Sequence, residues 1–227
     1  MKMIKQAPDL NSFFENGYDT STVDKSFIDH LAGYVFSEKF GSGTYPGVEN
    51  PIWDRDYQQL DLDFYKSQEK YVDLIKDVLK QDYFKYWNEI YGDFSFFKVS
   101  INKMQPGSSM DWHWDGFDGT FIQLLFYLQP LQQGEFEVGI AKNIQVNDTD
   151  SFPHWQPSKG LNYIASDVQT TGKIKISNNK MIILNNQNPK FVHRVNKTDA
   201  LRYSVIASCG HDSHWCHNKI KGYDIEE

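Results

Sequence analysis

Residues 111–128 read DWHWDGFDGTFIQLLFYL, and two patterns in this stretch indicate the architecture of the chain. At its start, His113 and Asp115 are two positions apart, so in an extended segment both side chains lie on one face. The remainder, 120–128, is an apolar run of strand length with several aromatic residues. The stretch therefore predicts an extended segment that carries a polar pair, followed by a strand of the core.

Further short runs rich in strand-forming residues are separated by Pro, Gly and Asn turns. They lie at 94–104, 135–140, 173–176, 181–184, 191–195 and 201–208. Many short strands without helices between them are typical of a sandwich or a barrel, not of a doubly wound parallel sheet. Segment 143–171 interrupts this spacing, and we expect it to be an insertion that serves as a lid or a binding loop.

The first ninety residues or so predict helices and loops instead. Apolar residues recur at helical spacing over 23–38, after a sequence at 21–24 that resembles a capping box. A second such pattern over 66–91 predicts one long amphipathic helix that ends at Gly92. The glycine-rich run 41–47 lacks the Gly-Lys-Ser/Thr of a phosphate-binding loop, which favours a plain loop.

Length and composition exclude several classes of protein. The chain has 227 residues, of which 40% are hydrophobic, enough for one domain with a sizeable core. Its 23 Lys and Arg against 30 Asp and Glu give a net charge of -7, which disfavours nucleic acid as a partner. The two cysteines, Cys209 and Cys216, exclude a disulfide framework. Since no apolar run is long enough for a membrane span or a leader, we expect a cytoplasmic protein with no membrane partner. Nothing in the sequence indicates an oligomeric state.

A metal site is the chemistry that the polar pair favours. His193, on a separate predicted strand, supplies a third ligand beside His113 and Asp115. Two imidazoles and one carboxylate on one side of a metal leave its other side open, as a mononuclear Fe(II) oxygenase requires. By itself, a His-x-Asp pair is weak evidence, because chance pairs are common and a surface loop is the more frequent explanation. Arg202 and Tyr127 add a guanidinium that can hold a carboxylate and a phenol that can assist it.

With these residues the sequence resembles the Fe(II)- and 2-oxoglutarate-dependent dioxygenases, and among them the prolyl 4-hydroxylase-like branch. The resemblance covers about 99–208 and rests, in chain order, on His113-Trp114-Asp115, Tyr127-Leu128, Gly134-Glu135-Phe136, His193-Arg194-Val195 and Arg202-Tyr203. It implies a mainly β fold with α-helices: a double-stranded β-helix of the jelly-roll, cupin-like type, buttressed by N-terminal helices. We therefore divide a single catalytic domain, 1–227, into a helical N-terminal buttress, 1–92, a core, 93–210, with its insertion, 143–171, and a tail, 211–227.

The resemblance also implies the roles of individual residues. The iron centre, which is also the catalytic centre, would consist of His113, Asp115 and His193. Arg202 would bind the distal carboxylate of the co-substrate 2-oxoglutarate with help from Tyr127. Strand alternation then places three more side chains in the co-substrate pocket: Gln123, Leu125 and Ser204. One departure is Gln105, because relatives of this type often carry a tyrosine directly before the Pro-Gly.

The implied reaction consumes O2, releases succinate and CO2, and hydroxylates an unactivated carbon of an amino-acid or peptidyl substrate, with proline the first candidate. The substrate is then a small molecule, a peptide or a protein. Trp155, in the expected insertion, and Arg194, beside a metal ligand, are candidates for contacting it.

Two other functions remain open from the sequence. An oxidative demethylase of alkylated nucleic acid is disfavoured by the net charge and by the short step from His193 to Arg202. A cupin-like module that binds without turnover would be expected if a metal ligand were missing. A second metal site in the tail, at 211–217 with Cys209, has zinc-type ligands but not their usual spacing.

Overall fold

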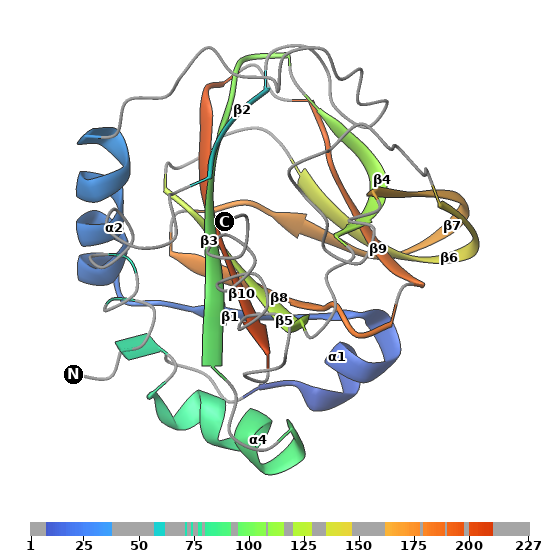
Figure 1. The fold of residues 1–227 in the computed structure, drawn as a ribbon, viewed down its shortest axis with the longest axis horizontal. Coiled ribbons are helices and arrows are strands. Elements are labelled where there is room, and N and C mark those ends of the chain that lie inside the picture. The colour runs from blue at the N-terminus through green and yellow to red at the C-terminus, as the bar shows by residue number, and fades with distance from the viewer. Residues whose placement is uncertain are drawn as a thin grey trace, which may run out of the picture.

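The strands form two antiparallel sheets that face each other, with helices on one side (Figure 1). This computed structural model describes residues 8–37, 57–61, 71, 74, 77–78, 80–91, 95–107, 109–115, 120–128, 135–146, 162–177, 179–188, 190–197 and 200–210. Its helices are α1 (Leu10–Asn16), α2 (Lys25–Ser37) and α4 (Asp82–Tyr91). Its strands are β1 (Tyr18–Thr22), β2 (Tyr57–Asp61), β3 (Ser95–Met104), β4 (Met110–Asp115), β5 (Thr120–Tyr127), β6 (Glu135–Val146), β7 (Asn162–Lys175), β8 (Lys180–Asn185), β9 (Phe191–Val195) and β10 (Arg202–Gly210).

The larger sheet has six strands in the order β1-β8-β5-β10-β3-β2. The other four strands pair in the order β4-β7-β6-β9 and close on themselves, because β9 also pairs with β4. In Figure 1 the long β6–β7 hairpin curls away from the larger sheet, on the side opposite α2. Two antiparallel sheets of this kind are the double-stranded β-helix that the sequence predicts.

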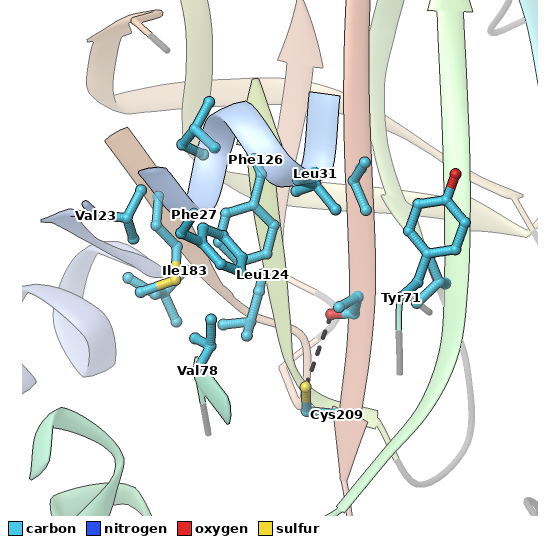
Figure 2. Packing of buried hydrophobic residues seen from close by; sticks show 14 of the residues in the cluster. Val23, Phe27, Leu31, Tyr71, Val78, Leu124, Phe126, Ile183 and Cys209 are labelled. Atoms are coloured by element: carbon cyan, nitrogen blue, oxygen red, sulfur yellow. Dashed lines mark hydrogen bonds between the residues drawn. The ribbon is translucent and has the colours of Figure 1, made fainter. Parts of the chain in front are cut away.

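One hydrophobic core lies between the helices and the outer face of the larger sheet. Helix α2 buries an apolar stripe that includes Phe27 and Leu31, and Phe27 packs edge-on against Phe126 of β5 at 5.3 Å between ring centroids. Figure 2 shows these residues together with Leu124 and Ile183 from the sheet. The helices therefore buttress one face of the sheet and leave its other face to the interior.

The start of α2 differs from the predicted capping box. Asp24 caps the helix, since its Oδ1 accepts a hydrogen bond of 2.8 Å from the Ser26 amide. Ser21, expected to be the cap, lies in β1 and pairs with Met181 of β8. Strand β1 was not predicted, because its buried positions are the polar Asp19 and Ser21, which hide the alternation.

The long helix predicted over 66–91 is interrupted. Residues 71, 74, 77 and 78 are helical, but a turn at 80–81 precedes α4. The Gln81 amide bonds the Val78 carbonyl at 3.0 Å, and the Phe84 amide bonds that of Gln81 at 2.9 Å. Val78, Phe84 and Trp87 are all fully buried, so the apolar pattern continues through the break and cannot reveal it. The glycine-rich run 41–47 lies outside the described residues.

The described parts of the expected insertion at 143–171 are strand. Residues 143–146 complete β6 and 162–171 begin β7, and the two pair from Val146↔Tyr163 onward. These strand ends carry exposed polar residues such as Asn143 and Thr170, which conceal their period from a sequence pattern. The remaining residues of the segment, 147–161, lie outside the described residues, and Trp155 is among them.

A second core fills the space between the two sheets. Its members are apolar side chains from the inner faces of both: Met104, Leu125, Tyr127, Phe136, Val138, Ile174, Ile182, Leu184 and Val195. This core forms the apolar surroundings in which the site residues lie. No helix within the described ranges has the length and apolar character needed to cross a membrane.

Candidate metal centre

Strands β4 and β9 bring His113, Asp115 and His193 together. His113 pairs directly with His193 across the two strands, and their ring centroids are 4.2 Å apart. The Asp115 carboxylate faces both rings, with Oδ1 at 3.5 Å from His113 Nε2 and Oδ2 at 3.5 Å from His193 Nε2. One ligand atom from each residue lies within 4.8 Å of the others. The structure therefore places the three predicted ligands around one point.

The backbone fixes which nitrogen of His113 faces this point. His113 Nδ1 lies 2.5 Å from the Asp111 carbonyl oxygen, which can only accept, so Nδ1 carries the proton. Nε2 is then a lone-pair nitrogen, and it is buried without a hydrogen-bond partner among the described residues. Burial, helped by the neighbouring His193, lowers the pKa of His113 to about 4, so the ring is neutral at pH 7. A neutral ring held by a backbone carbonyl is the form in which histidine binds metals.

Asp115 is held in its ionised form. Burial acts to raise the pKa of Asp115, but a hydrogen bond from His193, the charges that His193 and His113 carry when protonated at acidic pH, and a hydrogen bond from Gln123 hold that pKa well below its usual range. Asn186 fixes the backbone here, because its Nδ2 donates to the Asp115 carbonyl at 2.9 Å. The Asn186 carbonyl in turn accepts from Trp114 Nε1 at 3.2 Å. These contacts orient the carboxylate before any metal binds.

The ligand set fits a divalent transition metal. Two imidazole nitrogens and one carboxylate oxygen approach from adjacent strands. The buried Nε2 of His113, which has no hydrogen-bond partner among the described residues, is an atom that would coordinate the metal. A site of two histidines and one carboxylate, with further positions open, suits Fe(II) in particular.

Arg202, at the start of β10, forms the other half of the site. Its side chain is 1% exposed, and its Nη2 donates to the Asn196 carbonyl at 3.1 Å. Its Nε and Nη1 have no hydrogen-bond partner in the portion of the chain that the structure describes. A buried guanidinium with two unpaired nitrogens is costly, so this position is suited to an anionic ligand such as a carboxylate.

Tyr127 lies beside Arg202 on the neighbouring strand β5, where it pairs with Ser204 of β10. Burial raises the pKa of Tyr127 to about 12, although the charge of Arg202 acts against it. The phenol therefore keeps its proton and is able to donate it to the same carboxylate.

Between the metal centre and Arg202, polar side chains follow the inner face of the larger sheet. Across β5 and β10, Leu125 pairs with Ile206 and Gln123 with Ser208, and Ser204 follows on the same face. Gln123 is 2% exposed, and its Oε1 has no partner among the described residues. All three predicted pocket residues, Gln123, Leu125 and Ser204, are thus buried on the side that faces the second sheet.

Asn102 belongs to the same strip and was not predicted. It lies on β3 opposite Ser204, is 4% exposed, and has a buried Oδ1 without a partner within the described ranges. A polar residue at an inward position of a predicted strand was the available signal, but only the pairing with β10 shows that it neighbours Arg202.

Arg194 contacts an acidic neighbour. It alternates with His193 along β9, so it extends from the opposite face, where Nη2 lies 2.6 Å from Glu137 Oε2. Its guanidinium also stacks over the Trp112 ring at 4.7 Å. Trp155 and the residues of the tail, 211–217, lie outside the described residues.

Comparisons with known proteins agree with this geometry. No protein-family model matches the sequence, and a search of curated proteins finds no match. Among solved structures, a prolyl-4-hydroxylase from Pseudomonas putida superposes with a TM-score of 0.57 at 13% identity, covering 88% of this chain and 96% of its own. The chain has the fold of the 2-oxoglutarate and Fe(II) oxygenases. The predicted fold class, with a prolyl hydroxylase among the structural neighbours, is thereby confirmed.

Two further neighbours of this fold have bound ligands. A prolyl hydroxylase from Trichoplax adhaerens, in complex with a peptide of hypoxia inducible factor, gives a TM-score of 0.56 at 13% identity and covers 89% of this chain and 87% of its own. HygX from Streptomyces hygroscopicus, with nickel and 2-oxoglutarate bound, gives a TM-score of 0.56 at 10% identity. The match covers 89% of this chain and 86% of the HygX chain. At these identities the likeness shows the fold alone. The chemistry of this protein is inferred from its own site residues.

Proposed function

We propose that the protein is an Fe(II)- and 2-oxoglutarate-dependent oxygenase that hydroxylates an unactivated carbon of an amino-acid or peptidyl substrate, with proline the first candidate. The observation that carries the proposal is the pairing of two incomplete sites on facing sheets. One is the set of His113, Asp115 and His193, in which both histidines are buried, and the other is Arg202, whose Nε and Nη1 have no partner among the described residues. A dicarboxylate with a metal-binding end satisfies both at once.

Different residues would bind the metal and the co-substrate. His113, Asp115 and His193 would hold Fe(II), and Arg202 with Tyr127 would bind the distal carboxylate of 2-oxoglutarate. When bound, iron supplies the activation of O2, with 2-oxoglutarate oxidised to succinate and CO2. The balance is one O2, one 2-oxoglutarate and one C–H bond converted to one C–OH, one succinate and one CO2.

The surrounding core keeps water from the reacting atoms. Phe136 of β6 is fully buried and stacks on the His193 ring, with 5.3 Å between centroids and 22° between planes. Leu125 and Val138 add apolar surface between the sheets. A dry pocket of this kind protects a reactive oxidant and strengthens the Arg202–carboxylate interaction.

The substrate class is supported by the neighbours and by the charge of the chain. Two of the neighbours are prolyl hydroxylases, one of them in complex with a peptide. HygX is also known with hygromycin B bound, so the fold accepts small molecules as well. The net charge of -7 argues against a nucleic-acid substrate. The presence of all three ligands and of Arg202 argues against a module that binds without turnover.

The test is co-substrate turnover coupled to a substrate. Protein reconstituted with Fe(II) is incubated with 2-oxoglutarate, O2 and a panel of proline-containing peptides and free amino acids. We expect succinate to form, a product about 16 mass units heavier to appear, as addition of one oxygen atom requires, and His113→Ala to abolish both. His30→Ala, at an exposed histidine of α2, is the matched control and should retain activity. Folded, iron-loaded protein that forms no succinate with or without any of these substrates would contradict the proposal.

A further inference from the structure

Glu137 is a buried carboxylate on the outer face of the closed sheet, and it connects two segments that lead to the site. It is 2% exposed and lies directly opposite Arg194 in the pairing of β6 with β9. Arg194 Nε donates to Glu137 Oε2 at 2.8 Å. The other oxygen, Oε1, accepts from Asn196 Nδ2 at 3.0 Å and faces the exposed Lys173 Nζ at 3.5 Å. The carboxylate therefore holds the residue after His193 and the residue that follows β9.

The carboxylate stays ionised in this position. Burial acts to raise the pKa of Glu137, but the hydrogen bonds from Asn196 and Arg194 and the charges of Arg194 and Lys173 outweigh it and lower the pKa below 4.5. An ionised acceptor makes the stronger hydrogen bond with the Asn196 amide.

Asn196 continues the connection to the carboxylate pocket. Its backbone amide donates to the Glu135 carbonyl at 3.2 Å, and its side chain is bound by Glu137, so β6 holds it at two points. Its carbonyl oxygen accepts from Arg202 Nη2 at 3.1 Å. This is the one hydrogen bond of the Arg202 side chain that the described residues provide, since Nε and Nη1 have none there.

The orientation of the Arg202 guanidinium, and with it the direction of its unpaired Nε and Nη1 hydrogens, thus depends on the Asn196 carbonyl. A guanidinium is planar, so fixing Nη2 sets the plane in which Nε and Nη1 point. We propose that Glu137 and Asn196 are positioning residues for Arg202: the Glu137 carboxylate holds the Asn196 side chain so that the Asn196 carbonyl aims the guanidinium at the distal carboxylate of the co-substrate. The inference rests on the proposed function, and it assigns a role to two residues that touch neither metal nor ligand.

The test compares two ligands, so that a change in the orientation of Arg202 can be distinguished from a general loss of structure at the site. 2-Oxoglutarate and 2-oxopentanoate share the 2-oxo acid group and chain length, but 2-oxopentanoate has a methyl group in place of the distal carboxylate. Their dissociation constants are measured by calorimetry on the full chain loaded with Mn(II), without O2. The readout is the ratio of the two constants, which reports on the binding of the distal carboxylate by Arg202 and Tyr127 and requires no turnover.

Asn196→Ala removes the side-chain tie and leaves the backbone carbonyl in place. We expect it to lower the preference for 2-oxoglutarate about three- to tenfold, because small misplacement of a binding group weakens a directional contact, while affinity for 2-oxopentanoate stays unchanged. Asn143→Ala is the matched control: Asn143 lies on β6 and, like Asn196, donates to a carboxylate, that of Asp167 at 3.3 Å, but it is exposed. This control should keep the wild-type ratio, and Arg202→Met should bring the ratio close to one.

Glu137→Gln provides an independent variant of similar size, and it too should lower the ratio. The inference is overturned if wild-type protein prefers 2-oxoglutarate and neither Asn196→Ala nor Glu137→Gln changes that preference. It is equally overturned if both ligands weaken by the same factor, which is the signature of a merely structural role. A wild-type ratio near one is a different result, since it overturns the proposed function itself.

Discussion

Replacing Arg202 with methionine should make the protein more stable on its own and unable to respond to 2-oxoglutarate. The guanidinium is 1% exposed, carries a full charge and has a single hydrogen bond among the described residues, from Nη2 to the Asn196 carbonyl. Its desolvation is therefore poorly compensated when no ligand is bound. Methionine is flexible and of similar length, so it can fill the space without a charge.

The size of both effects follows from these contacts. Removing a buried, poorly compensated charge in favour of an apolar side chain should stabilise the protein without 2-oxoglutarate by about 1–3 kcal/mol. At about 2–4 °C per kcal/mol for a chain of this size, the melting temperature should rise by several degrees. Truncating one partner of a buried charge pair costs about 2–5 kcal/mol of binding, so affinity for 2-oxoglutarate should fall from about 30-fold to several thousand-fold.

The assay is thermal unfolding of Mn(II)-loaded wild type and Arg202→Met over a series of 2-oxoglutarate concentrations. Ligand that binds only the folded state raises the wild-type melting temperature with concentration, and the variant should start higher and stay flat. The reasoning is refuted if the variant is several kcal/mol less stable without ligand and still responds to 2-oxoglutarate. That pair of results would make Arg202 a structural residue.

Three further substitutions test other regions of the structure. Gln123→Leu removes the hydrogen bond to Asp115. It should weaken Mn(II) binding about 10- to 100-fold in a competition titration, because partners that orient a metal ligand contribute to metal affinity. Unchanged Mn(II) affinity would contradict an orienting role for Gln123. Glu137→Gln should have a lower free energy of unfolding in urea than wild type at pH 7. This difference should disappear as pH falls below 4.5 and through the lowered pKa of folded Glu137, because protonation removes the charge that strengthens its hydrogen bonds. A difference that does not depend on pH would be the contrary result. Phe13→Ala, at a fully buried ring 4.3 Å from Trp87, should cost about 3–5 kcal/mol of unfolding free energy. Phe14→Ala, next along α1 but 44% exposed, should cost much less, and equal losses would contradict the packing described.

The sequence indicated the strands of the core and the metal centre because both depend on local patterns. Strand β9 has the predicted bounds, and β5 and β10 differ by a residue or two. His113 and Asp115 share a face because the strand period is two, and this holds whatever the partner strand. Arg202 and Tyr127 were recognisable by residue type and order along the chain.

Features that depend on pairing between distant strands were beyond the reach of the sequence. Strand β1 buries Asp19, whose carboxylate accepts from the Asp9 amide at 3.0 Å, so a polar residue occupies an interior position. Asn102 joins the pocket only through its register with Ser204. The partner of Arg194, Glu137, is contributed by β6 and could not be named from the sequence around His193. In each case the deciding contact comes from a residue outside the local pattern.

If one site binds iron and 2-oxoglutarate together, anaerobic titration of the metal-free protein with Fe(II) and 2-oxoglutarate will show it. We expect a weak visible charge-transfer band that requires both additions, weakens in Arg202→Met and is absent in His193→Ala. Folded wild-type protein without this band at saturating Fe(II) and 2-oxoglutarate would mean that the two do not bind together at this site.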